Sequence, residues 1–265
     1  MSITQNKIAI IVGAGAVKNA WEPILNCFKP INAHETDADS INFLLAKYIC
    51  ALRLYSKSPR GAVQLKEELK TVSLLKEVIA EALKLGEAKG LLKPRKEFRT
   101  ILDKFVLSNP SNLFGIITTN WDTVIDNEAD RWVKDRYHNI ESAKVFHLHG
   151  SIESHKELYL PSETSMENYR TDAENDKIGY SHYQTLKFLM QANSLILYGI
   201  SLDPLDAELT LLLNGAFTPG TSIKEVIIIN PEYQKVRKRV KILLFRKNYI
   251  SIRCFHPEYL DIELK

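Results

Sequence analysis

Residues 7–15 read KIAIIVGAG. This short apolar run is rich in β-branched residues and ends at Gly13 and Gly15, which predicts a buried strand followed by a tight turn. Similar apolar runs stand at 113–118 (LFGIIT), 144–148 (KVFHL), 194–198 (SLILY) and 226–229 (VIII), and a last strand is expected over 250–255. Strands that alternate with helices predict a parallel sheet covered on both faces, which is a doubly wound, Rossmann-like α/β fold.

Helical patterns fill the spaces between these strands. We expect helices from near Trp121, over 183–192, over 204–213 and in the basic stretch 235–247. Residues 161–180 are polar and predict a loop or short helices.

The stretch from about residue 39 to residue 108 has a different character. Leu, Ala, Lys and Glu dominate it at helical spacing, with turn residues between the helical segments. The sequence therefore predicts a Rossmann-like domain formed by 1–30 and 108–265, with a helical insert over 31–107.

Composition excludes several classes of protein. The chain has 265 residues and a formal net charge of +3, which is too small to imply binding to nucleic acid or to a membrane surface. We interpret the basic stretch 235–247 as a solvated helix face or a subunit contact. No apolar run approaches the roughly 18 residues of a membrane span, and the N-terminal segment is too polar for a signal peptide.

Cysteine and histidine spacing argues against a metal site. Cys27, Cys50 and Cys254 are widely scattered and form no CxxC pair, which favours a reducing cytoplasm and no structural zinc. His147 and His149 share one face of a predicted strand, but no third ligand accompanies them. We therefore expect no metal.

Five of the six predicted strands end in a small or polar cluster. These clusters are GAG at 13–15, TTNWD at 118–122, HGS at 149–151, GIS at 199–201 and IN at 229–230. Ligands of open α/β sheets bind outside the carboxyl ends of the strands, so we expect the five clusters to line one crevice.

Structural interpretations of the same residues stay open. Gly13 and Gly15 alone fit a plain tight turn, because Lys18 stands where a dinucleotide fingerprint has its third glycine. Asn120 or Asp122 would cap the helix that follows. We interpret Trp21 and Trp121 as packing residues near the mouth of the site, with stacking of Trp121 on a ligand as the alternative.

The five clusters in this order resemble the motifs of the sirtuin-like (SIR2-like) family, over 7–30 and 110–255. The resemblance implies catalytic roles for Asn120, Asp122 and His149. It implies that the substrate NAD⁺ contacts Gly13, Ala14, Gly15, Thr119, Gly199, Ser201 and Asn230. No cofactor beyond the NAD⁺ substrate is implied.

The departures from the family pattern indicate which members of the family the chain is most similar to. No cysteine lies between Cys50 and Cys254, so the family's four-cysteine zinc module is missing, and AVKNAWEP at 16–23 replaces its proline- and arginine-containing stretch. Thr119 replaces a glutamine that is common before the Asn. The chain is therefore most similar to the zinc-free, NAD-consuming effectors of bacterial antiphage defence.

That branch implies an NAD⁺ hydrolase that acts by depleting NAD⁺. A deacylase or ADP-ribosyltransferase and a non-catalytic sensor of NAD or ADP-ribose are the alternatives. The implied partners are further copies of the chain, or a separately encoded sensor such as an Argonaute-like protein, a motor ATPase or a nucleotide-processing protein. The amphipathic helices between Ser40 and Leu92 and the basic helix are the surfaces expected to make these contacts.

Overall fold

A six-stranded, all-parallel sheet forms the centre of the molecule, in the order β5-β4-β1-β6-β7-β8. The computed structural model describes residues 6–28, 37–107, 112–137, 142–245 and 249–263. The strands are β1 (Lys7–Val12), β4 (Leu113–Thr118), β5 (Val145–His147), β6 (Ser194–Tyr198), β7 (Glu225–Ile229) and β8 (Ser251–Phe255). The predicted doubly wound, Rossmann-like fold is confirmed.

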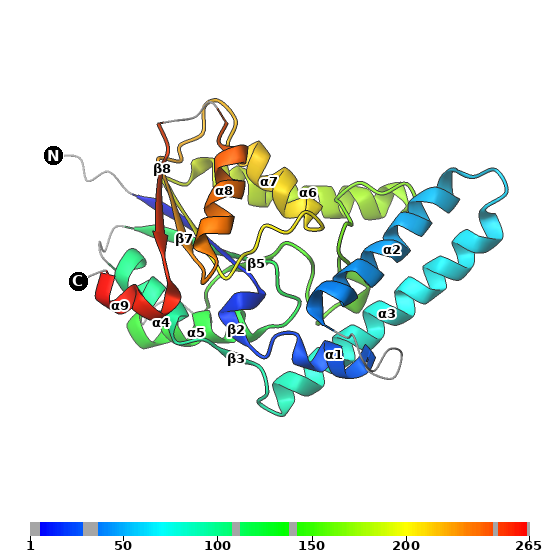
Figure 1. Ribbon diagram of the computed structural model, residues 1–265, viewed down its shortest axis with the longest axis horizontal. Helices are drawn as coiled ribbons and strands as arrows, with labels where there is room; N and C mark the ends of the chain where they lie inside the picture. Colours follow the sequence, from blue (N-terminus) through cyan, green and yellow to red (C-terminus); the bar gives the residue numbers. More distant parts are fainter. Residues whose placement is uncertain (1–5, 29–36, 108–111, 138–141, 246–248, 264–265) are drawn as a thin grey trace.

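Helices cover both faces of this sheet (Figure 1). One face packs against α4 (Glu97–Ile101), α5 (Val124–Arg136) and α9 (Leu260–Glu263). The other face packs against α6 (Asp172–Gln191), α7 (Ala207–Ala216) and α8 (Tyr233–Leu243). Alternate residues of each strand point to opposite faces, so Ile10 of β1 belongs to the first core and Ile11 to the second.

The chain changes direction across the sheet at β1. It runs from β1 to β4 and then β5 on one side, and later returns to place β6 on the other side of β1. At such a switch point the connections that follow the two central strands lead to opposite faces of the sheet, which opens a crevice at the carboxyl ends of these strands. The turns at Gly13 and Gly199 therefore border the crevice.

A long helical hairpin follows β1 and extends beyond one end of the sheet (Figure 1). It consists of α2 (Ala38–Lys57) and α3 (Ala62–Ala88), preceded by the short α1 (Glu22–Phe28). Ile41, Leu45, Ile49 and Leu52 are buried along one face of α2, as its helical spacing requires. The hairpin is the main part of the predicted insert, whose boundaries at residues 30, 31 and 108 lie outside the described residues.

The end of the predicted insert returns to the sheet. A two-residue antiparallel ribbon pairs β2 (Val17–Lys18) with β3 (Lys93–Pro94), and α4 continues into a π-helical turn over Leu102–Val106. Phe98 of α4 is fully buried and stacks on Tyr198 of β6, with ring centroids 6.5 Å apart. Three short 3-10 segments complete the described elements: Ala14–Ala16, His155–Glu157 and Pro257–Tyr259.

The prediction for residues 161–180 was wrong in its second half. Helix α6 begins at Asp172, eleven residues before the predicted start at residue 183. Thr171 accepts a hydrogen bond from the backbone N–H of Glu174, whose side chain in turn accepts from the backbone N–H of Thr171. This capping box was visible in the sequence TDAE and outweighs the polar composition of the first turns.

No helix in the described part of the chain is long and apolar enough to cross a bilayer.

Candidate active site at the carboxyl ends of the strands

A cavity of about 820 Å³ opens at the carboxyl ends of the strands. It lies at the switch point between β1 and β6, and α1, α2, α3 and the segment 159–163 contribute further parts of its wall. The ten residues predicted from the sequence all line it: Gly13, Ala14, Gly15, Thr119, Asn120, Asp122, His149, Gly199, Ser201 and Asn230. The structure therefore brings the five predicted clusters together.

Three glycines let two loops touch on the floor of the cavity. The backbone N–H of Gly13 donates to Tyr198 O at 3.0 Å, and that of Gly15 donates to Gly199 O at 3.1 Å. A Cβ at Gly13 would lie 2.7 Å from Gly199 O, and Gly199 itself adopts a φ of +63°. The tight-turn interpretation of Gly13 and Gly15 is confirmed, because side chains at these positions would block the approach of the two loops.

Asn120 is the most unusual side chain at the cavity. It is 6% exposed, and neither its amide oxygen nor its amide nitrogen has a hydrogen-bond partner among the described residues. Its backbone, in contrast, is fixed, since its N–H donates to Thr118 Oγ1 at 3.1 Å. A buried amide without partners costs about 1–3 kcal/mol. Such a group is expected where a ligand supplies the missing hydrogen bonds.

His149 is held between a carbonyl and a carboxylate. Its Nδ1 donates to Thr119 O at 3.1 Å, and its Nε2 lies 3.1 Å from Asp206 Oδ1. Because Nδ1 is a donor, Nε2 hydrogen-bonds a carboxylate only when it is protonated too. Burial lowers the pKa of His149, but the charge and hydrogen bond of Asp206 outweigh it, so the pKa is raised above its usual value.

Asp206 was missed in the sequence. It lies at the N-cap of α7, where its side chain accepts from the backbone N–H of Leu209 at 3.1 Å, and it also lines the cavity. Its position just before a predicted helix was visible, but a cap residue has no other distinguishing mark. Its contact with His149 depends on bringing the ends of β5 and β6 together, which no local pattern reveals.

The second histidine of the predicted pair, His147, contacts the backbone of Asn120 behind the cavity wall. His147 Nε2 lies 3.0 Å from Asp126 Oδ1, and its Nδ1 donates to Asn120 O at 3.1 Å. Burial lowers the pKa of His147, but the hydrogen bond and charge of Asp126 raise it by a larger amount, so the net shift is upward. His147 does not line the cavity. Of the two histidines, His149 is thus the one placed to contact a ligand.

Asp122 is a buried carboxylate at the start of α5. It is 3% exposed, and its Oδ1 accepts from the backbone N–H of Val124 at 3.1 Å, although the N-cap position of α5 is Thr123. Burial, aided by the nearby charge of Glu87, raises its pKa to about 6 despite that hydrogen bond. Glu87 belongs to α3 and accepts from the N–H and hydroxyl of Thr123, which joins the hairpin to this loop.

Asn230 ties two strand ends together at the far end of the cavity. Its Nδ2 donates to Ile200 O at 2.9 Å, and its Oδ1 accepts from the backbone N–H of Glu232 at 2.7 Å. Arg239 donates to the carbonyl oxygen of Ser201 at 2.8 Å. These bonds fix the loops after β6 and β7 that border the cavity.

Aromatic side chains form one side of the cavity mouth. The rings of Trp21 and Trp121 meet edge to face with centroids 6.4 Å apart, and Trp121 Nε1 donates to Tyr159 O at 2.9 Å. This is the packing arrangement predicted for both tryptophans. The hydroxyl of Tyr159 is buried without a hydrogen-bond partner among the described residues.

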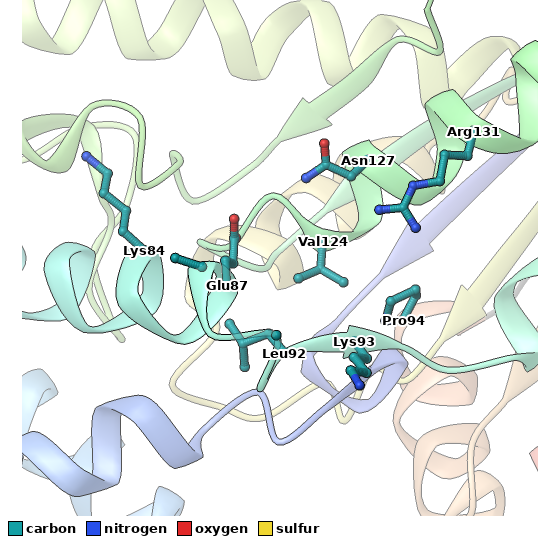
Figure 2. A pocket seen from close by; sticks show the side chains of 10 residues that line it. Lys84, Glu87, Leu92, Lys93, Pro94, Val124, Asn127 and Arg131 are labelled. Carbon is teal, nitrogen blue, oxygen red and sulfur yellow. The ribbon is translucent and has the colours of Figure 1, made fainter.

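A second hollow of about 760 Å³ lies between α3, β3 and α5. Figure 2 shows Val124, Asn127 and Arg131 of α5 across from Glu87 of α3. None of the ten predicted residues lines this hollow. Glu87, which lines it and also holds Thr123, lies between the hollow and the loop of Asp122. The first cavity is therefore the candidate active site.

The described residues contain no group of three or more His, Cys, Asp or Glu side chains that could hold a metal ion.

Comparison with known proteins adds no relative: no family model, no curated protein and no solved structure matches this chain.

Proposed function

We propose that this protein hydrolyses the nicotinamide–ribose bond of NAD⁺ in the cavity at the carboxyl ends of its strands. One observation carries the proposal. The buried, unpartnered amide of Asn120 and the His149–Asp206 pair stand together at the switch point of a doubly wound sheet. We propose NAD⁺ as the ligand because the five strand-end motifs resemble those of the sirtuin-like family.

The size and shape of the cavity suit a dinucleotide. Ligand cavities commonly measure about 300–1,000 Å³, and this one, at about 820 Å³, is near the upper end. It extends from Asn230, at the end of β7, past the glycine floor to Asn120 and His149. The adenosine would occupy the Asn230 end and the nicotinamide the Asn120 end.

The leaving group makes the reaction accessible. Nicotinamide departs as a neutral pyridine from a cationic ring, so the site must mainly hold the ribose and stabilise oxocarbenium character. The amide of Asn120 would position the attacking water or the carboxamide of nicotinamide. Ionised Asp122 would stabilise the positive charge that develops on the ribose.

His149 would remove the proton in this reaction. The water oxygen forms a bond to C1′ of the ribose, the bond from C1′ to the nicotinamide nitrogen breaks, and one water proton passes to Nε2 of His149. This requires His149 to be neutral beforehand. Because Asp206 raises the pKa of His149, the reaction would be fastest at a pH above that raised pKa.

A non-catalytic sensor of NAD or ADP-ribose is the second candidate. It is favoured by one observation: both ring nitrogens of His149 are already engaged, Nδ1 by Thr119 O and Nε2 by Asp206. A binding module needs fixed donors of this kind, whereas a general base needs a free nitrogen. The two candidates differ in whether nicotinamide is released.

The proposed setting is bacterial antiphage defence, in the cytoplasm, with NAD⁺ depletion as the effect. An unregulated hydrolase would exhaust the NAD⁺ of its own cell, so activity must be controlled. We propose control by assembly with further copies of the chain or with a separately encoded sensor. The α2–α3 hairpin and α8 are the proposed contact surfaces.

The test is product analysis after incubation of the purified protein with NAD⁺. Equal amounts of nicotinamide and free ADP-ribose identify hydrolysis. Nicotinamide with ADP-ribose attached to an acceptor identifies a transferase. Binding of NAD⁺ with no nicotinamide released, both alone and after co-expression with its genomic neighbours, identifies the sensor.

A further inference from the structure

The glycine turn of the cavity leaves few backbone amides for a phosphate group, because three of the four N–H groups of residues 13–16 donate within the fold. A strand-end turn usually binds a diphosphate through backbone N–H groups that point at the ligand. Here the N–H groups of Gly13, Gly15 and Ala16 donate to Tyr198 O, Gly199 O and Gly13 O. A diphosphate at this turn therefore needs positive charge from a side chain.

Few positively charged side chains at the cavity could bind a diphosphate. Acidic side chains outnumber basic ones among the described lining residues, where Lys235 and Arg95 are the Lys and Arg side chains present. Lys235 lies 3.6 Å from the carboxylate of Glu232. Arg95 has no ion pair within the described part of the chain. Its guanidinium is exposed and free to meet a ligand.

The backbone of Arg95 is fixed beside the glycine turn. Its N–H donates to Ala16 O at 2.9 Å, directly after the β2–β3 ribbon pairs Pro94 with Val17. Asn19 Nδ2 adds a bond to Leu91 O at 3.3 Å. The segment that ends the predicted insert is thus attached to the segment that leaves the turn, and Arg95 follows the turn.

Neighbouring electrostatics agree with this placement. Burial and the charge of Glu97 raise the pKa of Tyr198, while the positive charge of Arg95 opposes that shift. Tyr198 is the last residue of β6, and its carbonyl oxygen accepts from Gly13. The guanidinium of Arg95 is therefore near enough to the Tyr198 side chain to affect the pKa of its hydroxyl.

We infer that Arg95 binds the diphosphate of the dinucleotide substrate and selects for ligands that carry one. A guanidinium presents paired N–H donors that match two phosphate oxygens, which no remaining group at this turn offers. The inference rests on the proposed function, since it concerns the same cavity. It adds a ligand-binding role for a residue of the segment between the hairpin and the sheet.

The experiment titrates the purified protein with ADP-ribose and with adenosine, which lacks the phosphates. Arg95→Ala is expected to weaken ADP-ribose binding at least about tenfold, as loss of a charged hydrogen bond implies, and to change adenosine binding less than about twofold. Arg95→Lys is expected to recover part of the loss, because it keeps the charge without the paired donors. The matched control is Lys96→Ala, which removes the adjacent exposed cation that does not line the cavity.

The outcomes separate this inference from the proposed function. If Arg95→Ala binds ADP-ribose as tightly as the wild type, or if Lys96→Ala loses as much affinity, the role of Arg95 is wrong while the site stands. If the wild-type protein binds neither NAD⁺ nor ADP-ribose, both fail. Arg95→Gln, which keeps a long polar side chain, replaces Arg95→Ala if the alanine variant melts at a lower temperature than the wild type.

Discussion

At the scale of single residues, the candidate site is marked by polar groups that the fold alone does not satisfy. Asn120 carries a buried amide without partners, and Asp122 is a buried carboxylate whose pKa is raised to about 6. Each of these groups reduces stability unless something in the cavity compensates it. Sites of binding and catalysis commonly show this conflict with stability.

Asp122→Asn should stabilise the protein at neutral pH. The folded state raises the pKa of Asp122 from 3.8 to about 6, so at higher pH it holds a buried charge that the unfolded chain exposes to water. The gain in free energy of unfolding is at most about 3 kcal/mol above roughly pH 7 and vanishes below about pH 4, where both states are protonated. Urea unfolding at the two pH values measures it.

Asp176→Asn is the control for this prediction, because Asp176 is exposed on α6. Its effect should stay within about 0.5 kcal/mol at either pH. An Asp122→Asn protein that is less stable than the wild type near pH 8 would show that the carboxylate is compensated within the fold.

Asp206→Asn should move the pH dependence of NAD⁺ cleavage. In the wild type, kcat/KM should rise with pH through the raised pKa of His149, since deprotonation creates the general base. Removing the carboxylate leaves burial as the main influence on His149, so the midpoint of this rise should move to lower pH. A pH–rate profile of both proteins measures the shift.

Asp203→Asn provides the comparison for that profile. Asp203 also lines the cavity, but its side chain accepts from the backbone N–H of Leu205 and does not contact His149. An equal shift in both variants would mean that general charge at the cavity, and not the His149–Asp206 contact, sets the midpoint.

At the scale of elements, the α2–α3 hairpin is joined to the cavity by buried ion pairs. Lys76 of α3 lies 3.0 Å from Glu163, which lines the cavity and also accepts from Arg170 at 2.6 Å. Burial alone would raise the pKa of Glu163, but the charges of Lys76 and Arg170 lower it. Arg53 of α2 makes a further ion pair with Glu167.

Glu163→Gln should therefore weaken the whole fold. The substitution keeps the size of the side chain but leaves the charges of Lys76 and Arg170 buried without their partner. Breaking a buried pair in this way costs about 3–5 kcal/mol. The loss is read from the free energy of unfolding in urea.

Glu157→Gln removes one partner of an exposed pair with Lys177 and is the matched control. Exposed pairs contribute about 0–1 kcal/mol, so this variant should stay close to the wild type. An equal loss in free energy of unfolding for the two variants would mean that burial does not strengthen the ion pairs of Glu163 with Lys76 and Arg170.

At the scale of the whole molecule, the sheet was predictable from sequence and the contacts between distant segments were not. Strands such as β1 and β6 follow from apolar runs that end in glycine turns, and parallel pairing then places their ends at one edge. The capping box of α6 was present in the sequence, but the polar residues around it led to a predicted helix start that was eleven residues too late.

The missed residues share a physical cause. Asp206 meets His149 because β6 lies beside β1, and Arg95 meets the glycine turn because the two-residue ribbon returns from the hairpin. Both contacts join segments that are more than 50 residues apart in the chain. Local patterns locate each residue on a helix or loop, but they do not encode which partner it meets.

The proposed hydrolysis of NAD⁺ is tested most directly by measuring the release of nicotinamide from NAD⁺ by the purified wild-type protein and by Asn120→Ala. Release by the wild type is expected, alone or after co-expression with its genomic neighbours, with a rate at least about a hundredfold lower for Asn120→Ala. His147→Ala, altered just outside the cavity, should retain more activity than His149→Ala. Release at equal rates by the wild type and Asn120→Ala, or no release under any condition, would contradict this proposal.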